Sequence, residues 1–446
     1  MKSRLIIFLI SVLSVYIVLN RFEWHQNKTI EWDKGGYYIY LPAAFIYQDL
    51  GTFSFLPEIN KKYRPSADVE WYAMYDQPST GRRLNKYPVG VALFEFPFFL
   101  AAHLLTIATN RYPADGYSSF YQLGICLATV FWVMMGLFLL RRFLLRYFDD
   151  RTTALTLLMI ALGTNLYNYT SFDFGMSHPF SFFLFAAFIN AVDLWYTKQN
   201  TRHLLLAGII TGLIIITRPT NIVIVVVALL WGNDGMKNIR DRLLFFKKQI
   251  GPMCLSVFLC FAVVMFQLGY WKYATGNWVH YSYEEEGFNF ANPEIWKGLF
   301  SYRKGWFVYS PIAFISFIGF IALWKYYRKM VLPLLIYFVV TIYIVFSWHQ
   351  WWYGGGFGAR AMVESYALMA IPLAGLLYWI KNRNSKPLKI ISSAIFVCLI
   401  ALNMFQTYQF SIAVIPWDHT NKEYYWRVFL KDHRTDEDWQ VLNFNE

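Results

Sequence analysis

The amino-acid sequence predicts an all-α protein that crosses a membrane many times. Of its 446 residues, 57% are hydrophobic, 20% are aromatic and 15% are charged, a balance too apolar for a soluble chain of this length. The apolar residues form runs of helical length, and the basic residues gather in the connectors between these runs. Together the two patterns predict about 11 transmembrane helices, with juxtamembrane helices in a long first outer loop.

The first predicted crossing covers residues 4–19. Lys2 and Arg4 precede this apolar run as they would in a signal peptide, but no small-x-small cleavage site precedes the polar stretch at 20–25. We therefore expect a retained first helix with the N-terminus inside. The four cysteines lie in apolar runs without disulfide or metal-ligand spacing, so they indicate nothing about the compartment.

The net charge of +12 does not indicate nucleic-acid binding, because its distribution follows the membrane topology instead. Lysines and arginines cluster in connectors at 141–151, 198–202, 237–248, 325–329 and 381–389. The positive-inside rule predicts that these connectors are cytoplasmic.

The apolar run Val89–Ile107 decides the helix count. If it crossed, every later loop would be inverted and the basic clusters would lie outside, so we expect a juxtamembrane or re-entrant helix here. The remaining crossings are predicted at 118–140, 152–170, 178–196, 203–217, 220–232, 251–271, 306–324, 330–347, 363–380 and 389–410.

This topology divides the chain into a transmembrane domain, residues 1–410, and a short outer tail, residues 411–446. The long first outer loop, residues 20–117, belongs to the transmembrane domain. Nearly all chemically reactive side chains outside the basic connectors then fall on the outer face. A reaction centre facing the periplasm or another exoplasmic space is the simplest interpretation.

Asp33 is the first candidate for catalysis. It lies in the run EWDKGGYY, residues 31–38, soon after the first crossing, and a helix-like run follows at 39–46. A carboxylate at the lipid–water boundary is a base that can meet a lipid-linked substrate. Aspartate is also a favoured N-cap, so Asp33 capping a helix that starts near Gly36 is the structural alternative.

Arg218 is a second candidate, at the turn RPTN between the arms 203–217 and 220–232. Each arm is shorter than the ~20 residues that span a bilayer, so the turn can sit below the outer surface. An arginine at that depth is costly unless an anionic group pairs with it. A hairpin tip whose arginine snorkels to the interface explains the pattern equally well.

An early outer-loop aspartate, amphipathic juxtamembrane helices and a second outer loop with Asp173 and His178 resemble the GT-C class of integral-membrane glycosyltransferases. The segments FSYRKGWFVYSP at 300–311 and WWYGGGFGAR at 351–360 resemble bacterial members of that class. The resemblance implies a GT-C-like fold and sugar transfer from a polyprenyl-phosphate donor to an acceptor hydroxyl. It also implies a bacterial inner-membrane location with the active site facing the periplasm, surrounded by membrane lipids and without a nucleic-acid partner.

In that class the acid of the first loop is the usual catalytic residue, and the match falls on Asp33 as general base. Because Lys34 follows it, the sequence lacks the adjacent acidic pair of several relatives, which puts metal binding at this loop in doubt. The resemblance leaves a divalent cation, Mg²⁺ or Mn²⁺, open as a cofactor. It assigns acceptor or metal binding to Asp173 and His178, for which helix capping and interfacial packing are the alternatives.

Four basic residues on the outer side are candidates for binding the lipid phosphate: Arg218, Arg303, Lys304 and Arg360. Arginine offers a phosphate two parallel donors and lysine a point charge, although basic residues at helix ends also simply snorkel. The glycines before Arg360 would let the backbone approach a ligand closely.

Aromatic side chains surround these candidates. Their faces stack on sugars and isoprenoids, but the interfacial belt of any membrane protein has the same composition. The candidates for lining the substrate are Tyr37, Trp351, Trp352 and Tyr353.

Two other function classes remain open. A polysaccharide polymerase or ligase with a lipid-diphosphate donor would use the outer arginines and would not need Asp33. A lipid or glycan transporter would carry broken helices and charges at the bilayer centre, and apart from Arg218 the predicted helices hold few. The tail at 411–446 is too short for a soluble domain of the kind found in oligosaccharyltransferases, so the expected acceptor is a glycan, a lipid or a lipid-linked precursor.

Overall fold

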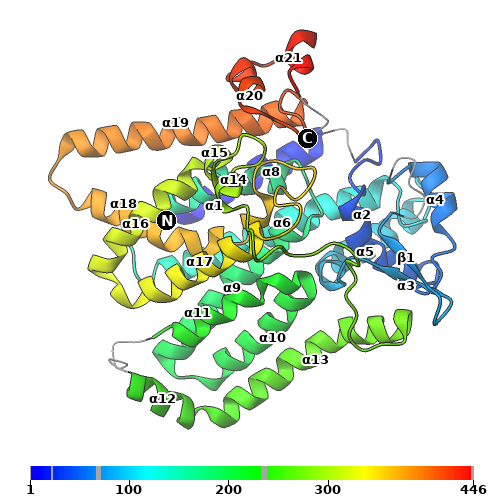
Figure 1. Ribbon diagram of the computed structural model, residues 1–446, viewed down its shortest axis with the longest axis horizontal. Helices are drawn as coiled ribbons and strands as arrows, with labels where there is room; N and C mark the ends of the chain where they lie inside the picture. Colours follow the sequence, from blue (N-terminus) through cyan, green and yellow to red (C-terminus); the bar gives the residue numbers. More distant parts are fainter. Residues whose placement is uncertain (1, 22–23, 67–71, 233–238, 443–446) are drawn as a thin grey trace.

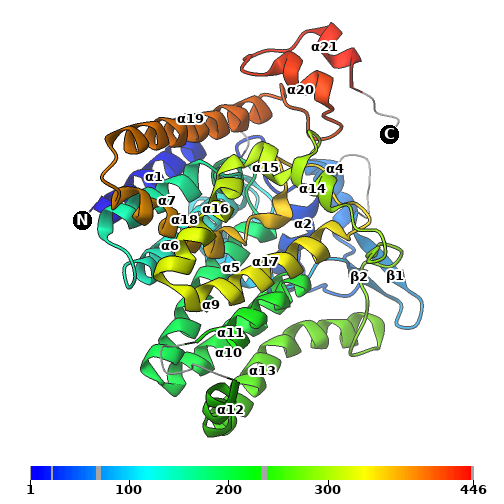
Figure 2. The ribbon, with the colours of Figure 1, turned by 60° about the vertical axis from the view of Figure 1, so that its left-hand side comes forward.

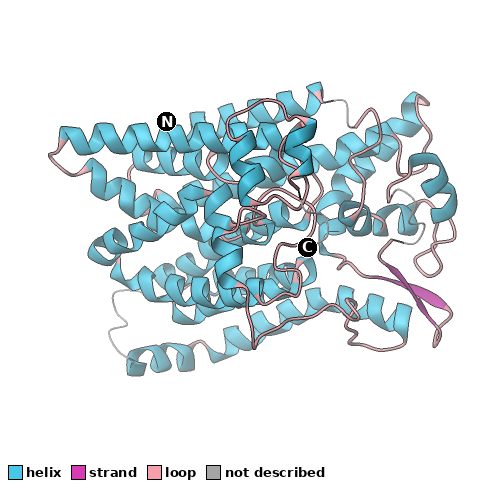
Figure 3. Ribbon diagram, turned by 45° about the horizontal axis from the view of Figure 1, so that its top comes forward, coloured by secondary structure: helices cyan, strands magenta, loops and turns pink. Residues whose placement is uncertain are grey.

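The computed structural model describes residues 2–21, 24–66, 72–232 and 239–442, and over these ranges the protein is almost entirely helical (Figure 3). The α-helices are α1 (Lys2–Asn20), α2 (Asp33–Tyr38), α3 (Tyr40–Phe45), α4 (Leu56–Tyr63), α5 (Gly90–Thr109), α6 (Ser119–Leu144), α7 (Asp150–Leu162), α8 (Leu166–Ser171), α9 (Ser177–Lys198), α10 (Thr201–Thr217), α11 (Val225–Leu230), α12 (Ile239–Lys248), α13 (Ile250–Thr275), α14 (Ile295–Phe300), α15 (Trp306–Tyr309), α16 (Pro311–Tyr326), α17 (Val331–Phe346), α18 (Tyr366–Lys381), α19 (Lys386–Ser411), α20 (Lys422–Val428) and α21 (Asp436–Gln440). Short 3-10 helices are η1 (Pro219–Ile224), η2 (Arg328–Met330) and η3 (Arg360–Met362), and the strands are β1 (Met74–Gln77) and β2 (Arg82–Asn85).

Seven helical segments of the described chain are long and apolar enough to cross a membrane. They are α1, α5, α6, α9, α13, η2 with α17, and α19. Shorter apolar segments accompany them, namely α10, η1 with α11, α16 and α18. The structure thus confirms a mostly helical protein with several candidate transmembrane helices, and the hairpin β1–β2 is an exception to the all-α prediction.

The crossing predicted at 152–170 is wrong as a single helix, because α7 ends at Leu162 and α8 begins at Leu166. Gly163 marks the break. A Cβ placed on it would lie 2.1 Å from Cδ1 of Ile312 in α16 and 2.7 Å from the carbonyl oxygen of Met159, so a larger residue here would force its neighbours to shift. The crossing predicted at 306–324 is also interrupted, because Pro311 begins a new helix after Ser310.

One end of the bundle, on the left in Figure 1, gathers the N-terminus with two of the basic connectors. The backbone N–H of Lys2 donates to Asp150 at 2.7 Å, which joins the start of α1 to the start of α7. Lys381 forms an ion pair with Asp149 at 2.9 Å, which joins the α18–α19 connection to the same point. Two of the connectors that the positive-inside rule predicts to be cytoplasmic, 141–151 and 381–389, therefore meet in space beside the N-terminus.

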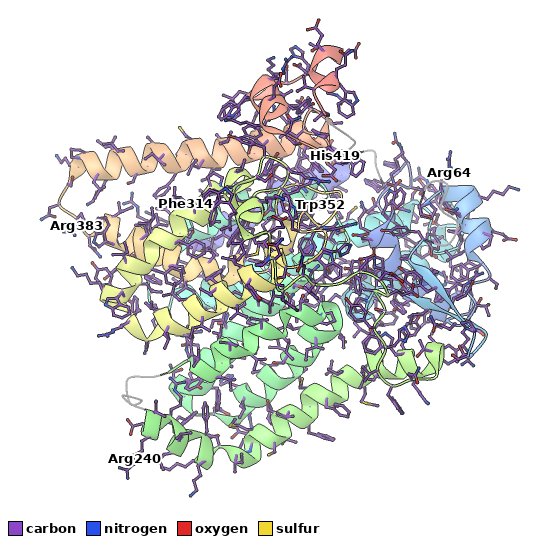
Figure 4. All side chains as sticks on the ribbon, viewed as in Figure 1. Arg64, Arg240, Phe314, Trp352, Arg383 and His419 are labelled. Atoms are coloured by element: carbon purple, nitrogen blue, oxygen red, sulfur yellow. The ribbon has the colours of Figure 1, made fainter. Side chains whose placement is uncertain are left out.

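Side-chain positions agree with this arrangement (Figure 4). Arg240 and Arg383, from two basic connectors, lie toward the left of the molecule, whereas Arg64 of the first outer loop lies on the right. Lys237 of the predicted connector 237–248 lies outside the described residues.

The first outer loop forms a separate layer at the opposite end, from α2, α3, α4, the antiparallel hairpin β1–β2 and α5 (Figure 1). Both ends of α5 lie at this end of the bundle. Its start is held where the Val89 backbone N–H donates to Gln267 near the end of α13 at 2.9 Å. Near its other end, Nδ1 of His103 lies 2.5 Å from the hydroxyl of Tyr121 in the first turn of α6. The juxtamembrane or re-entrant placement of this run stays a prediction, because α5 is a single helix that is also long and apolar enough for a crossing.

Two glycines set the position of α10, which ends just before Arg218. A Cβ on Gly208 would lie 2.3 Å from the carbonyl oxygen of Ser256, and a Cβ on Gly212 would lie 2.7 Å from that of Cys260. The spacing of four residues lets α10 and α13 cross in close backbone contact, as in other membrane helix pairs.

The described part of the tail forms α20 and α21, which project beyond the helix bundle (Figure 2). Gln409 at the end of α19 donates to the carbonyl oxygens of Val428 and Lys431, at 2.8 and 2.7 Å. Thr435 and Asp438 form a capping box at the start of α21. The tail is thus a small helical cap fixed to the end of α19.

Candidate active site

Asp33 is the first residue of α2, in the layer formed by the first outer loop. The preceding Trp32 has a φ of 50°, a backbone conformation that is costly for a bulky residue. The Trp32 backbone N–H donates to the carbonyl oxygen of Pro65 at 2.9 Å and so fixes this turn. Trp32, not Asp33, is the N-cap residue, and no side chain caps the helix. The structure therefore excludes N-capping as the role of Asp33.

The Asp33 carboxylate has three hydrogen-bonding partners. The hydroxyls of Tyr72 and Tyr87 donate to Oδ1 at 2.7 and 2.6 Å, and Arg360 Nη2 lies 2.8 Å from Oδ2. Burial acts to raise the pKa of Asp33, but the Arg360 charge and the tyrosine hydroxyls outweigh it and lower the pKa to about 2. Asp33 is therefore ionised at neutral pH.

The glycine-rich loop that delivers Arg360 depends on backbone conformations open to glycine. Gly354, Gly356 and Gly358 have φ values of 65°, 149° and 59°. A Cβ on Gly356 would lie 2.7 Å from the hydroxyl of Tyr169. That hydroxyl in turn accepts a hydrogen bond from the backbone N–H of Phe357 at 3.0 Å. The glycines thus bring the backbone against Tyr169, and the loop begins η3 with Arg360 beside Asp33.

A second cluster lies one turn further along the chain, around Glu364. His178 Nδ1 is 3.0 Å from Glu364 Oε2, and Arg218 Nε is 3.3 Å from Oε1. Arg218 Nη1 lies 3.4 Å from His178 Nε2, which closes the triangle. Glu364 is thus the anionic partner that an arginine at this depth requires.

Two aromatic residues connect the Asp33 and Glu364 clusters. The Arg218 guanidinium lies 6.0 Å from the ring centroid of Tyr353, and the ring of Tyr37 packs on Tyr87 at 4.6 Å. Arg218 and Asp33 both act on the buried Tyr37 hydroxyl, whose pKa is raised chiefly by burial. Tyr37 and Tyr353 therefore belong to this site.

Arg360 keeps donor capacity for a ligand. Among the described residues, its buried Nε has no hydrogen-bonding partner, whereas Nε of Arg218 already faces Glu364 Oε1 at 3.3 Å. Unpaired buried donors are costly, so such groups in a cleft are positions where a ligand oxygen would be bound favourably.

Asp173 and His178, which were predicted together, have separate partners. Asp173 forms an ion pair with Lys34 at 3.1 Å, beside Asp33 but outside the Glu364 cluster. In the described residues no group of three or more His, Cys, Asp or Glu side chains could hold a metal ion. The carboxylates of Asp33, Asp173 and Glu364 already pair with lysine or arginine side chains. The residues present therefore do not fit a divalent metal ion at this site.

Arg303 and Lys304 do not converge on Asp33. Arg303 forms a bidentate ion pair with Asp418 of the tail at 2.7 and 2.9 Å. The Lys304 ammonium is buried and donates to the carbonyl oxygens of Gly356 and Trp417. Burial lowers the pKa of Lys304 to about 7. Both residues tie the tail to the glycine-rich loop.

Trp351 and Trp352 have a different environment from Tyr353. The Arg303 guanidinium stacks on the Trp352 ring at 3.8 Å, and both tryptophans line a separate cavity. The structure therefore divides the predicted aromatic group, with Tyr37 and Tyr353 at the arginines and the two tryptophans at the cavity.

Several site residues were missing from the sequence-derived candidates. Tyr72, Tyr87 and Glu364 contact the predicted residues directly, and Lys34 pairs with Asp173. Glu95 of α5 is also buried, and neither carboxylate oxygen has a partner among the described residues. Glu95 is the one of these residues that the sequence could have singled out, because acidic residues inside apolar runs are rare.

No family model and no curated protein matches this chain. One of the solved structures that it does match is the crystal structure of the oligosaccharyltransferase of Archaeoglobus fulgidus in the apo form. The identity is 13% and the TM-score 0.47, and the match covers 98% of this chain but 59% of that chain. A similarity at this level assigns no function by itself, so function must be inferred from the site.

Proposed function

We propose that this protein is a membrane glycosyltransferase that moves a sugar from a polyprenyl-phosphate donor to an acceptor hydroxyl, with Asp33 as general base. One observation carries the proposal, namely an ionised, partly exposed aspartate paired with Arg360 and close to a second arginine, Arg218. A base beside two guanidinium groups suits a reaction that takes a proton from one substrate and leaves negative charge on a phosphate.

The proposed step is a single displacement at the anomeric carbon. The acceptor oxygen bonds to that carbon while its proton passes to Asp33, and the bond between the anomeric carbon and the phosphate oxygen breaks. The electron pair leaves with the polyprenyl phosphate, whose additional negative charge faces Arg360 and Arg218. Charge-assisted hydrogen bonds from guanidinium groups to phosphate oxygens stabilise the leaving group.

Donor binding also explains how an aspartate with such a low pKa becomes a useful base. In the ligand-free arrangement Arg360 lowers the basicity of Asp33. A donor phosphate that takes over the Arg360 guanidinium removes this stabilisation and raises the pKa of Asp33 toward the range in which a base is effective. Base activation would thus follow donor binding, which limits unproductive chemistry in the empty site.

The proposal places the reaction at the outer face of the membrane, the periplasmic face in a bacterium. Asp33 lies at the end of the bundle opposite the basic connectors, which the positive-inside rule assigns to the cytoplasm. A lipid-linked donor would reach Asp33 at the boundary between the bundle and the first outer loop. The acceptor would be a glycan, a lipid or a lipid-linked precursor.

The test is turnover of a matched panel of polyprenyl-phosphate and polyprenyl-diphosphate sugars by the purified protein and by Asp33→Asn. We expect the wild type to release polyprenyl phosphate, with or without EDTA, and the variant to lose this release. Equal turnover by both proteins would exclude the base role. Turnover of diphosphate donors alone would favour a polymerase or ligase, and a lack of turnover accompanied by lipid transport would favour a transporter. If EDTA abolished the activity of the wild type and added Mg²⁺ or Mn²⁺ restored it, the proposal that the step needs no metal would be wrong.

A further inference from the structure

A cavity of about 550 Å³ lies beside the candidate active site, between the segments 289–303 and 346–352. Its size is within the ~300–1,000 Å³ range of small-molecule sites. Its walls combine three tryptophans, Trp348, Trp351 and Trp352, with the side chains of Asn289 and Asn292. Aromatic faces and amide groups together match the two surfaces of a sugar, its apolar C–H faces and its hydroxyl edge.

The aromatic walls are held in place from behind. Arg303 stacks on Trp352 at 3.8 Å and is itself fixed by Asp418, so the ring cannot turn freely. Trp348 packs edge-on against Phe288 at 4.8 Å and forms an isolated β-bridge with it. Rigid aromatic platforms lose little conformational entropy when a ligand binds.

The charges in the cavity are already compensated. Glu294 pairs with Lys297 at 2.9 Å, and Arg303 pairs with Asp418 at 2.7 Å. A phosphate would have to break the Arg303 pair, whereas Arg360 keeps a free buried Nε at the other site. The cavity therefore suits a neutral sugar better than a lipid phosphate.

The cavity and the active site share one segment of chain. Trp352 lines the cavity, the next residue, Tyr353, packs by Arg218, and the glycine-rich loop then leads to Arg360 beside Asp33. Figure 4 labels Trp352 near the middle of the molecule, below His419 of the tail. A chain of sugars seated in the cavity would thus lie next to the site where a new sugar is attached.

We infer that this cavity binds terminal sugar residues of a neutral glycan acceptor and presents the acceptor hydroxyl to Asp33. The inference rests on the proposed function, which it deepens by naming the acceptor as a glycan. Trp352 would supply the stacking surface, and Asn292 would bind hydroxyl groups.

The inference is tested first by binding, without any donor. Fluorescently labelled full-length protein in detergent is applied to an array of neutral oligosaccharides built from hexoses, deoxyhexoses and N-acetylhexosamines. We expect a defined subset to bind the wild type and Asp33→Asn equally, and binding to fall by roughly tenfold in Trp352→Ala and in Asn292→Ala. Trp296→Ala is the matched control, because Trp296 is 74% exposed and does not line the cavity.

A glycan identified on the array is then used as acceptor in steady-state kinetics. We expect Asn292→Ala to raise the KM for the glycan and to leave the KM for the donor unchanged. Failure of every array glycan to bind the wild type, unchanged binding in both cavity variants, or a rise in the donor KM instead would overturn the inference. Glycan binding that depends on Trp352 and Asn292 without transfer from any donor would overturn the proposed reaction but keep the cavity as a glycan site.

Discussion

Two arginine–aspartate pairs lie near the glycine-rich loop and differ in how many of their polar atoms are engaged. In the tail pair, Arg303 and Asp418, both carboxylate oxygens and two guanidinium nitrogens are engaged, and the guanidinium also stacks on Trp352. In the site pair, Arg360 and Asp33, there is one contact at 2.8 Å. The Asp33 carboxylate is 19% exposed against 5% for Asp418.

The difference separates a structural ion pair from one that can exchange partners. A bidentate, stacked pair commits two guanidinium nitrogens to the carboxylate, and breaking it leaves an uncompensated charge on the buried Asp418. The site pair keeps the buried Nε of Arg360 free and holds the carboxylate with two tyrosine hydroxyls as well. Arg360 can therefore turn to a phosphate while Asp33 keeps two hydrogen bonds.

The largest expected effect comes from removing the negative charge of each pair in turn. Asp33→Asn should lower kcat for sugar transfer by about 10²–10⁴-fold, the usual contribution of a general base. Asp418→Asn should leave kcat at saturating acceptor nearly unchanged and should instead expose the tail to proteolysis. Equal losses of kcat in the two variants would show that both pairs are structural. Gel filtration and thermal melts of both proteins control for misfolding.

Replacing each arginine by lysine gives the next largest effect. Arg360→Lys keeps the positive charge but loses the two parallel N–H groups of the guanidinium. The kcat/KM for the sugar donor should therefore fall by roughly 10–100-fold, the worth of one hydrogen bond to a charged group. Arg303→Lys should have little effect on this constant. A donor kcat/KM that responds to Arg303→Lys as strongly as to Arg360→Lys would move the phosphate site to the tail pair.

The comparison also shows what the sequence can and cannot predict. Composition and the distribution of basic residues predict a helical membrane protein with its reactive side chains at one end. Both properties average over many residues, so no single contact decides them. The break at Gly163 could not be predicted in this way. It lies at a close contact with Ile312 of α16, a residue far away in the sequence, whereas the break at Ser310 had a local signal in Pro311.

The same limit applies to the site. Asp33, Arg218 and Arg360 stand out by local context, since each is a charge next to glycines, proline or a membrane-length run. Their partners do not stand out, because Tyr87 is 54 residues from Asp33 and Arg360 is 327 residues from it. Tyrosines are also so frequent in this chain, at 32 of 446 residues, that no single one is conspicuous.

A smaller effect is expected from Lys304, which connects the tail to the glycine-rich loop. Its folded-state pKa of about 7 lies below the ordinary 10.5, so between these values the unfolded chain binds a proton that the folded chain has lost. The free energy of unfolding should therefore rise with pH across that window, by up to about 1.4 kcal/mol per pH unit.

Lys304→Met should remove this part of the pH dependence, as measured by denaturant unfolding at pH 7 and pH 9. Lys297→Met is the matched control, because Lys297 is an exposed lysine of the same outer segment and should keep the wild-type slope. An unchanged slope in Lys304→Met would mean that Lys304 remains charged in the folded protein and that its two carbonyl contacts hold an ammonium ion across this range.

The smallest predicted effect tests the feature that most clearly distinguishes the site pair, its tyrosine hydroxyls. Tyr72→Phe removes one hydrogen bond to the ionised Asp33, so the pKa of Asp33 should rise and the acid limb of the kcat profile should move to higher pH. The loss in kcat should be only severalfold, because Tyr87 still donates to the same oxygen.

Tyr63→Phe breaks a similar bond to Asp115 in the same outer loop and should leave the acid limb in place. If both variants shift the limb equally, the titrating group is not Asp33 and the profile reports the stability of the loop. If only Tyr72→Phe shifts it, the group that titrates during turnover is the carboxylate that Tyr72 contacts.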